Sequence, residues 1–130
     1  MDDLYLLLHP YDAVEAFHEA FGLLRGEHPE LPDLPTRGLR IKLLREEFEE
    51  YLKAEAEDDL VEVADALADI IYIAYGTAVA YGIPLDRVFA EVHKSNMAKL
   101  VDGKVIRRAD GKILKPETWT PPDIKGVLGI

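Results

Sequence analysis

Apolar residues recur every three or four positions along most of residues 11–100, a spacing that is typical of amphipathic helices. A helix turns once in 3.6 residues, so these positions share one face and can pack against neighbouring helices. Gly82, with Pro84 just beyond it, marks the clearest helix end. The pattern predicts four helices, over residues 11–25, about 37–56, about 59–81 and 86–99.

Turn-forming residues dominate the rest of the chain. Pro29, Pro32 and Pro35 predict a stiff, extended connector, because each proline fixes its own backbone and disfavours helix in the residue before it. Beyond residue 100, the dipeptides Asp102-Gly103 and Asp110-Gly111 predict turns. Short extended pieces on both sides of the second turn predict a small hairpin.

We therefore expect an all-α fold, a bundle of four main helices followed by a small C-terminal β-hairpin and an irregular tail. In that tail, Asp123 would start one short turn of helix. A chain of 130 residues, 48% of them apolar, can form one domain with its own core. The expected parts are an N-terminal extension over 1–10, a helical core over 11–100 and a basic tail over 101–130.

Apolar helix faces are expected to form the core. The third helix is apolar at nearly every other position, so we expect it to be buried. On the second helix, Glu47 and Glu50 lie on the flank of the apolar arc, near the border with the core. The other core contacts are expected from the second and fourth helices, at Ile41, Leu44, Phe48, Tyr51, Leu52, Val88, Phe89, Val92 and Met97.

The charge of the chain is unevenly distributed. Residues 1–93 contain seven basic and 21 acidic residues, whereas residues 94–130 contain eight basic and four acidic ones. The formal net charge of −10 argues against a nucleic-acid polymer as partner, because phosphate backbones are bound largely by clustered Lys and Arg. An acidic body and a basic tail suit a metal-bound nucleotide, although the tail could equally serve only to neutralise the body.

The composition also bears on the cellular compartment of the protein and on the kinds of site it can form. The chain has no cysteine, which excludes a disulfide framework and a thiolate metal site. Its first residues lack the basic flank and apolar run of a signal peptide, and no stretch reaches about 18 uninterrupted apolar residues. We expect a cytoplasmic protein that does not span a membrane.

Six carboxylates lie on adjacent turns of the second and third helices, and a short turn over 57–59 would bring these helices together as an antiparallel pair. Arg45 and Lys53 are the only basic residues between 43 and 86, so a divalent cation explains the acidic cluster better than ion pairs do. Oxygen ligands without His or Cys favour Mg²⁺, with Mn²⁺ as an alternative. The predicted metal-binding residues are Glu46, Glu47, Glu50, Glu62, Asp65 and Asp69.

Each of these carboxylates also has a simpler interpretation. Glu46 and Glu50 could belong to a solvated helix face, and Glu62 could stabilise the positive end of the third helix. Asp65 and Asp69 carry more weight, because they interrupt an apolar helix in which Ala or Leu would pack better. Magnesium usually retains water and bridges to substrate phosphates, so a magnesium site implies a phosphorylated ligand.

The acidic helices resemble those of the MazG-like all-α nucleoside triphosphate pyrophosphohydrolases. The resemblance begins at Glu46-Glu47-Phe48-Glu49-Glu50 and Glu62–Tyr72, which are similar to the Glu-x-x-Glu and Glu-x-x-Asp helices of that superfamily. It extends through Tyr75-Gly76, Glu91–Lys99 and Ala109–Trp119, which are similar to a branch with a dUTP-hydrolysing member. The superfamily also includes phosphoribosyl-ATP pyrophosphohydrolase and the dimeric dUTPases.

One position departs from the branch. Its metal-binding Asp falls on Asp69, but the partner Glu three residues earlier falls on Ala66. Asp65 is expected to supply the missing ligand, with Glu62 as the third choice on this helix. Alternatively, Glu62 and Asp65 form the motif themselves and Asp69 is accessory.

The resemblance implies Mg²⁺-dependent hydrolysis of a nucleoside triphosphate to monophosphate and pyrophosphate, with dUTP or another pyrimidine deoxynucleotide as substrate. Glu47 is expected to act as the catalytic base, in addition to lying among the metal-binding residues. One alternative is phosphoribosyl-ATP hydrolysis in histidine synthesis. Another is a helical oligomer whose acidic patch binds cations or a basic partner without catalysis.

The resemblance also implies residues that bind the substrate. Lys94, Asn96 and Lys99 could contact phosphate or sugar oxygens, or could simply form a cationic helix end. His18, between Phe17 and Phe21, resembles a base-pocket position of the superfamily, or could have only a structural role, and Trp119 is expected to anchor the tail. The residues predicted to bind the substrate are His18, Lys94, Asn96, Lys99, Arg107 and Lys112. The apolar surplus on the third and fourth helices predicts a homodimer or a dimer of dimers.

Overall fold

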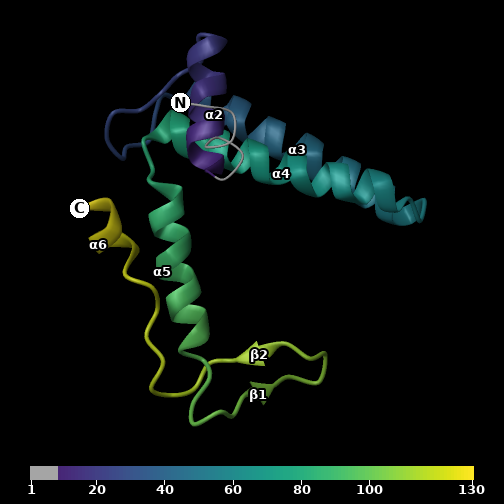
Figure 1. Cartoon of the computed structure of the whole chain (residues 1–130), viewed down its shortest axis with the longest axis vertical. Coiled ribbons are helices and arrows are strands. Elements are labelled where there is room, and N and C mark those ends of the chain that lie inside the picture. The colour runs from purple at the N-terminus through teal and green to yellow at the C-terminus, as the bar shows by residue number, and fades with distance from the viewer. Residues whose placement is uncertain (1–8) are drawn as a thin grey trace. The chain divides into compact units, whose positions relative to one another are not determined.

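The computed structural model describes residues 9–130 and is mostly helical, with four main helices and a small two-stranded antiparallel hairpin (Figure 1). This confirms the predicted fold class. Residues 1–8, which make up most of the expected N-terminal extension, lie outside the described residues. The elements are α2 Pro10–Ala20, α3 Leu34–Ala56, α4 Leu60–Tyr81, α5 Leu85–Met97, β1 Ile106–Arg107, β2 Ile113–Leu114 and α6 Ile124–Leu128.

The chain divides into two compact units, one ending at Ile83 and the other beginning at Pro84. The first unit contains α2, α3 and α4, and both α2 and α3 pack against α4. The second contains α5, the hairpin and α6, and α6 packs against α5. The predicted boundary between core and tail at residue 100 does not coincide with this division.

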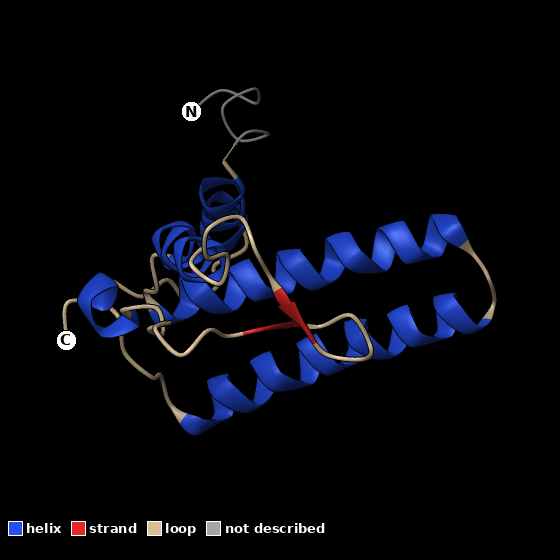
Figure 2. Cartoon of the chain, turned by 90° about the horizontal axis from the view of Figure 1, so that it is seen from below, coloured by secondary structure: helices blue, strands red, loops and turns tan. Residues whose placement is uncertain are grey.

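In the first unit, α3 and α4 form a long antiparallel pair joined by a tight turn (Figure 2). The turn contains Asp58 in a left-handed conformation, with φ of 53°. Asp59 then caps α4, since its side chain accepts a hydrogen bond of 3.1 Å from the Glu62 amide. At the other end, Gly82 terminates α4 with φ of 69°, as the sequence predicts.

Small side chains form the core of the first unit. Gly76 is buried on α4, and small residues at a helix interface let two backbones approach closely. The buried apolar residues are Val14, Ala54, Ala66, Ala78, Val79 and Ala80. The connector after α2 is tied to the same end of α4, because the Gly26 amide donates to the Val79 carbonyl at 2.8 Å.

Several predicted helix boundaries shift. The first helix ends at Ala20 instead of residue 25, because Gly22 takes a left-handed conformation with φ of 66°. The second helix begins at Leu34 and includes Pro35 in its first turn, where the missing amide hydrogen costs no helical bond. Asp33 caps this start by accepting a hydrogen bond from the Thr36 amide at 3.1 Å. The fourth helix begins and ends slightly earlier than predicted.

The prediction for the packed face of α3 was wrong. The apolar arc was expected to form core contacts, but within this chain Ile41, Phe48 and Leu52 are each at least half exposed. The face that packs against α4 instead carries Arg40 and Ala54, both buried, with Glu47 half-buried between them. The predicted core contacts of α5 also fail at Phe89 and Met97, which are exposed.

The expectation that α4 is buried along its whole length was also wrong. Leu60 is 80% exposed, and Leu67 and Ile71 are also exposed in this chain, whereas the buried positions cluster toward the end at Gly82. By length and hydropathy alone, α4 could cross a membrane. Length and hydropathy are weak evidence for a membrane span, because the core helix of a globular protein meets the same criterion. This helix also carries three carboxylates.

In the second unit, one aromatic side chain joins the tail to α5. The Trp119 indole Nε1 donates a hydrogen bond of 2.7 Å to the Ser95 carbonyl. The Lys115 Nζ lies 4.5 Å from the centroid of the indole ring, and the Lys99 Nζ lies 5.9 Å from it. Trp119 therefore anchors the tail, as its proline-rich surroundings predict. The hairpin forms around Asp110-Gly111, also as predicted.

Candidate metal centre

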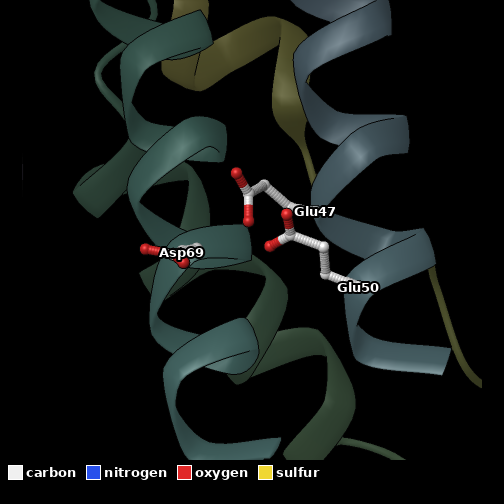
Figure 3. A group of neighbouring side chains, drawn as sticks. All are labelled: Glu47, Glu50 and Asp69. Carbon is white, nitrogen blue, oxygen red and sulfur yellow. The ribbon is translucent and has the colours of Figure 1, made fainter. Parts of the chain in front are cut away.

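Three carboxylates meet between α3 and α4. Glu47 and Glu50 lie one turn apart on α3, and Asp69 lies on α4. Each offers an oxygen atom within 4.8 Å of the others. Figure 3 shows the two glutamates extending from α3 toward the helix that carries Asp69. A single cation could contact all three residues.

The seven-residue spacing along α3 explains why a glutamate lies at this interface. Positions seven apart differ by only about 20° around a helix axis, so Arg40, Glu47 and Ala54 share one face. That face packs against α4, which places the Glu47 carboxylate among side chains of the neighbouring helix. Glu50, on the edge of the same face, stays exposed.

Glu47 is the most strongly perturbed member of the group. Its Oε2 atom is buried and has no hydrogen-bond partner among residues 9–130. Burial raises the pKa of the Glu47 carboxyl, and the neighbouring charges of Glu50, Asp69 and Asp65 raise this pKa further. A buried, unpartnered carboxylate oxygen next to two other acids is costly without a proton or a cation.

The chemistry of the three ligands fits a hard divalent cation. All the donors are carboxylate oxygens, which Mg²⁺ and Mn²⁺ prefer. Within residues 9–130, no lysine or arginine forms an ion pair with any of the three acids. The negative charge at this point is therefore not compensated by side chains of the described part of the chain.

The other three predicted metal ligands lie outside this group. Glu46 and Asp65 are exposed, and Asp65 is close enough only to raise the pKa of Glu47. Glu62 is also exposed and lines a separate cavity of about 300 Å³, together with Glu50, Lys53, Ala54 and Glu57. The premise that Asp65 is buried was wrong, and Asp69 is only half-buried.

Ala66, where the family resemblance places a ligand, is buried at 3% exposure. It lies on the part of α4 that is packed within the first unit. An alanine in place of the expected glutamate therefore leaves one ligand fewer on this buried face. The group of three draws two ligands from α3 and one from α4. The ligand roles of Glu46, Glu62 and Asp65 stay predictions.

The residues predicted to bind the substrate are divided between the two units. Lys94 and Asn96 are exposed on α5, Lys99 follows its end, and Arg107 and Lys112 belong to the hairpin region. His18 lies in the first unit and is only 3% exposed, with its Nδ1 2.9 Å from the Leu24 carbonyl oxygen. This burial favours a packing role for His18 over direct contact with a base.

A larger apolar cavity, of about 530 Å³, lies between α2 and α4. Two of its lining residues, Ala68 and Tyr72, flank Asp69 in the sequence, one residue before it and three after it. The rest of the lining consists of Pro10, Ala13, Val14, Ile71 and Tyr75. The cavity is large enough for a flat heterocycle and offers mostly apolar surface.

Arg40, the other polar residue on the packed face of α3, was not among the residues predicted from the sequence. It is 9% exposed and bonds to α4 through two nitrogen atoms. Its spacing of seven residues from Glu47 was the available signal, since that spacing assigns both residues to one face.

A family match supports the resemblance to the MazG-like all-α nucleoside triphosphate pyrophosphohydrolases. The model of the phosphoribosyl-ATP pyrophosphohydrolase family, which is part of this superfamily, matches residues 14–96. The chain belongs to the phosphoribosyl-ATP pyrophosphohydrolase family. The match includes all three carboxylates and ends before the hairpin.

The chain is also similar to a viral protein. It is 38% identical over 80 residues to the uncharacterized protein L479 of Acanthamoeba polyphaga mimivirus. The alignment covers 58% of this chain and 32% of the viral protein, so the chain matches about a third of that relative's length.

Proposed function

We propose that this chain hydrolyses a nucleoside triphosphate to its monophosphate and pyrophosphate in a reaction that depends on Mg²⁺. The observation that carries the proposal is the meeting of Glu47, Glu50 and Asp69 within 4.8 Å. The buried, unpartnered Oε2 of Glu47 supports it, because such an atom needs a proton or a cation.

In this proposal, Glu50 and Asp69 hold the metal, and Glu47 lies close enough to contact it. Bound Mg²⁺ would neutralise phosphate charge and lower the pKa of a water molecule. The Glu47 Oε2 would accept a proton from the attacking water. The raised pKa of Glu47 suits this role, since a base works best when its pKa approaches the ambient pH.

We propose dUTP or another pyrimidine deoxynucleotide as the substrate, as in the dUTPase-like branch that the sequence resembles. The apolar cavity between α2 and α4 would take the base, and its closeness to Asp69 along α4 supports this assignment. The family resemblance is the support for Lys94, Asn96, Lys99, Arg107 and Lys112 as residues that bind phosphate or sugar, and this role stays a prediction.

Phosphoribosyl-ATP is the second candidate substrate. The family match to residues 14–96 favours it, because the family is described by that activity. This reaction would use the same carboxylates, so only the preferred nucleotide separates the two proposals.

The exposed apolar residues of α3 and α4 lead us to propose a homodimer. Leu60, Leu67 and Phe48 are each more than 45% exposed in the single chain, and a second copy would remove such apolar surface from water. A mass of two chains in solution by light scattering is the expected result, and a monomer at micromolar concentration would refute it.

Pyrophosphate release tests the activity. The purified chain is assayed with a panel of dNTPs, NTPs and phosphoribosyl-ATP, in Mg²⁺ and in EDTA. We expect Mg²⁺-dependent release, with a pyrimidine dNTP hydrolysed fastest and Asp69→Asn inactive at a retained fold. Glu49→Gln, an exposed change on α3, serves as the control. Fastest hydrolysis of phosphoribosyl-ATP would favour the second candidate, and no turnover of any nucleotide would refute both.

A further inference from the structure

A buried arginine ties α3 to α4, and no carboxylate within residues 9–130 forms an ion pair with it. Arg40 Nε donates a hydrogen bond to the Thr77 hydroxyl at 3.0 Å, and Arg40 Nη2 donates one to the Ile73 carbonyl at 2.8 Å. Arg40 is 9% exposed, and burial lowers the pKa of its guanidinium. A cation is thus held inside the first unit by neutral acceptors of a single helix.

The opposite helix provides a slot for this side chain. Gly76 lies one residue before Thr77, and a Cβ atom at Gly76 would collide with the Arg40 guanidinium. The same Cβ would lie 3.2 Å from the Nε2 atom of His18, which α2 contributes to this point. The three helices of the first unit therefore meet at one close-packed polar contact.

Stability alone does not account for a buried guanidinium. Removing a charge from water is expensive, and well-packed apolar residues often replace buried charged groups with no loss of stability. The two hydrogen bonds of Arg40 are directional, however, whereas apolar contacts between Ala-rich faces tolerate sliding. Arg40 can therefore fix the alignment of α3 and α4, which an apolar side chain at position 40 would not do.

That alignment is the one on which the carboxylate group depends. Arg40 precedes Glu47 by two turns, about 10 Å along α3. Its acceptors on α4, Ile73 and Thr77, follow Asp69 by about one and two turns. Because the helices are antiparallel, the alignment that brings Arg40 to its acceptors on α4 also brings Glu47 to Asp69. A shift of one helical turn would separate Glu47 from Asp69.

We propose that Arg40 is a positioning residue that holds α3 in register with α4, so that Glu47 and Glu50 meet Asp69. Gly76 contributes to this positioning, because only a residue without a side chain leaves room for the Arg40 guanidinium. The inference rests on the proposed function in one respect: the metal affinity that it predicts belongs to the proposed metal centre.

Arg40→Met is the principal variant. Methionine keeps most of the buried volume and removes the charge and both hydrogen bonds. No polar group is stranded, since the Thr77 hydroxyl can bond to the Ile73 carbonyl, four residues earlier in the same helix. We therefore expect the melting temperature of Arg40→Met to equal or exceed that of the wild type, so that a change in the site cannot be attributed to unfolding.

Two readouts are measured on the full chain. Binding of Mn²⁺, followed by the electron paramagnetic resonance signal of the free ion, reports the metal affinity. Spin labels on cysteines introduced at Glu49 and Ala64, both exposed, report the distance between α3 and α4. Labelled chain is diluted with unlabelled chain, so that only distances within one chain contribute.

We expect Arg40→Met to bind Mn²⁺ about tenfold more weakly and to show a shifted or broadened distance distribution. Gly76→Ala, which displaces the guanidinium from the other side, should do the same, and it tests the proposal separately if Arg40→Met does not fold. Val79→Ala is the control, because it removes buried volume from α4 but keeps both hydrogen bonds of Arg40, and it should change only the melting temperature.

A wild-type distance distribution in both folded variants would overturn the inference, as would wild-type Mn²⁺ affinity. Failure of the wild-type chain to bind Mn²⁺ would instead refute the proposed metal centre. The distance distribution would still decide whether Arg40 sets the alignment of the two helices.

Discussion

Replacing Glu47 by glutamine should stabilise the protein without metal and weaken its response to metal. Glutamine has nearly the same shape but carries no charge, so the change removes the repulsion from Glu50, Asp69 and Asp65 and leaves the packing of α3 intact. The advantage of glutamine should largely vanish when Mg²⁺ is added, because the wild-type carboxylate then gains a cation while glutamine does not. Few structural roles for Glu47 other than metal binding predict such a dependence on metal.

The magnitude follows from the separation of the charges. Two carboxylates 4.8 Å apart repel by about 1 kcal/mol in water and about 3 kcal/mol at the effective dielectric constant of a protein surface. Glu50 is exposed and Asp69 half-buried, so the lower value applies better, and we expect Glu47→Gln to gain about 1–2 kcal/mol without metal. For a unit of this size, each 1 kcal/mol raises the melting temperature by roughly 4–8 °C.

The pH dependence has a defined direction. Because the folded-state pKa of Glu47 is raised above its ordinary value of 4.5, the contribution of this carboxyl to the stability of the metal-free wild type is fully present below that value. It loses stability as the pH rises through the raised pKa and Glu47 ionises against its neighbours. The advantage of Glu47→Gln should therefore be absent at acidic pH and complete near neutral pH.

Thermal unfolding followed by circular dichroism measures these effects in EDTA and in 10 mM Mg²⁺. A site with millimolar affinity would add about 1.4 kcal/mol to the wild type in that concentration of Mg²⁺ and nothing to Glu47→Gln. Glu49→Gln is the matched control, since Glu49 is exposed on the same helix and lies outside the group of three. A lower melting temperature for Glu47→Gln in EDTA would refute the reasoning, and so would equal stabilisation of both proteins by Mg²⁺.

Two further predictions concern the fold. Trp119→Phe removes the hydrogen bond from the indole to the Ser95 carbonyl. We expect amide hydrogen exchange in the tail to become about tenfold faster, which corresponds to a loss of about 1.4 kcal/mol in the free energy of local opening. Unchanged exchange in the tail would contradict the anchoring role. Gly82→Ala should lower the melting temperature more than Gly22→Ala does: both glycines have positive φ, but only a Cβ at Gly82 would collide with the backbone of His28. Equal losses for the two variants would show that the His28 contact is unimportant.

Local chemistry was sufficient to predict most of the elements. A capping Asp59, a left-handed Gly82 and the Asp110-Gly111 turn act within a few residues of their own positions, so their effects could be read directly from the sequence. The end of the first helix was predicted five residues too late, because nothing in the apolar spacing indicates that Gly22 leaves the helix. Such boundaries depend on how the following connector is bonded.

The candidate site was predicted less completely than the elements. On a helical wheel, Glu62, Asp65 and Asp69 lie within roughly 60° of one another, so periodicity alone could not rank them. They differ in height along α4, and only the position opposite Glu47 belongs to the group of three. That position is Asp69, and the ligand role of Asp65 stays a prediction.

The sequence by itself determined that two acidic helices adjoin, that their carboxylates outnumber nearby cations, and that oxygen ligands would favour magnesium. Those conclusions follow from residue types and spacing within single helices. Only the tertiary structure decided which carboxylates meet, because the rotation and the alignment of α3 against α4 are properties of the pair. The apolar arc of α3 suggested one packed face, but the helix packs through the face of Arg40, Glu47 and Ala54, which places an unpartnered carboxylate oxygen at the interface.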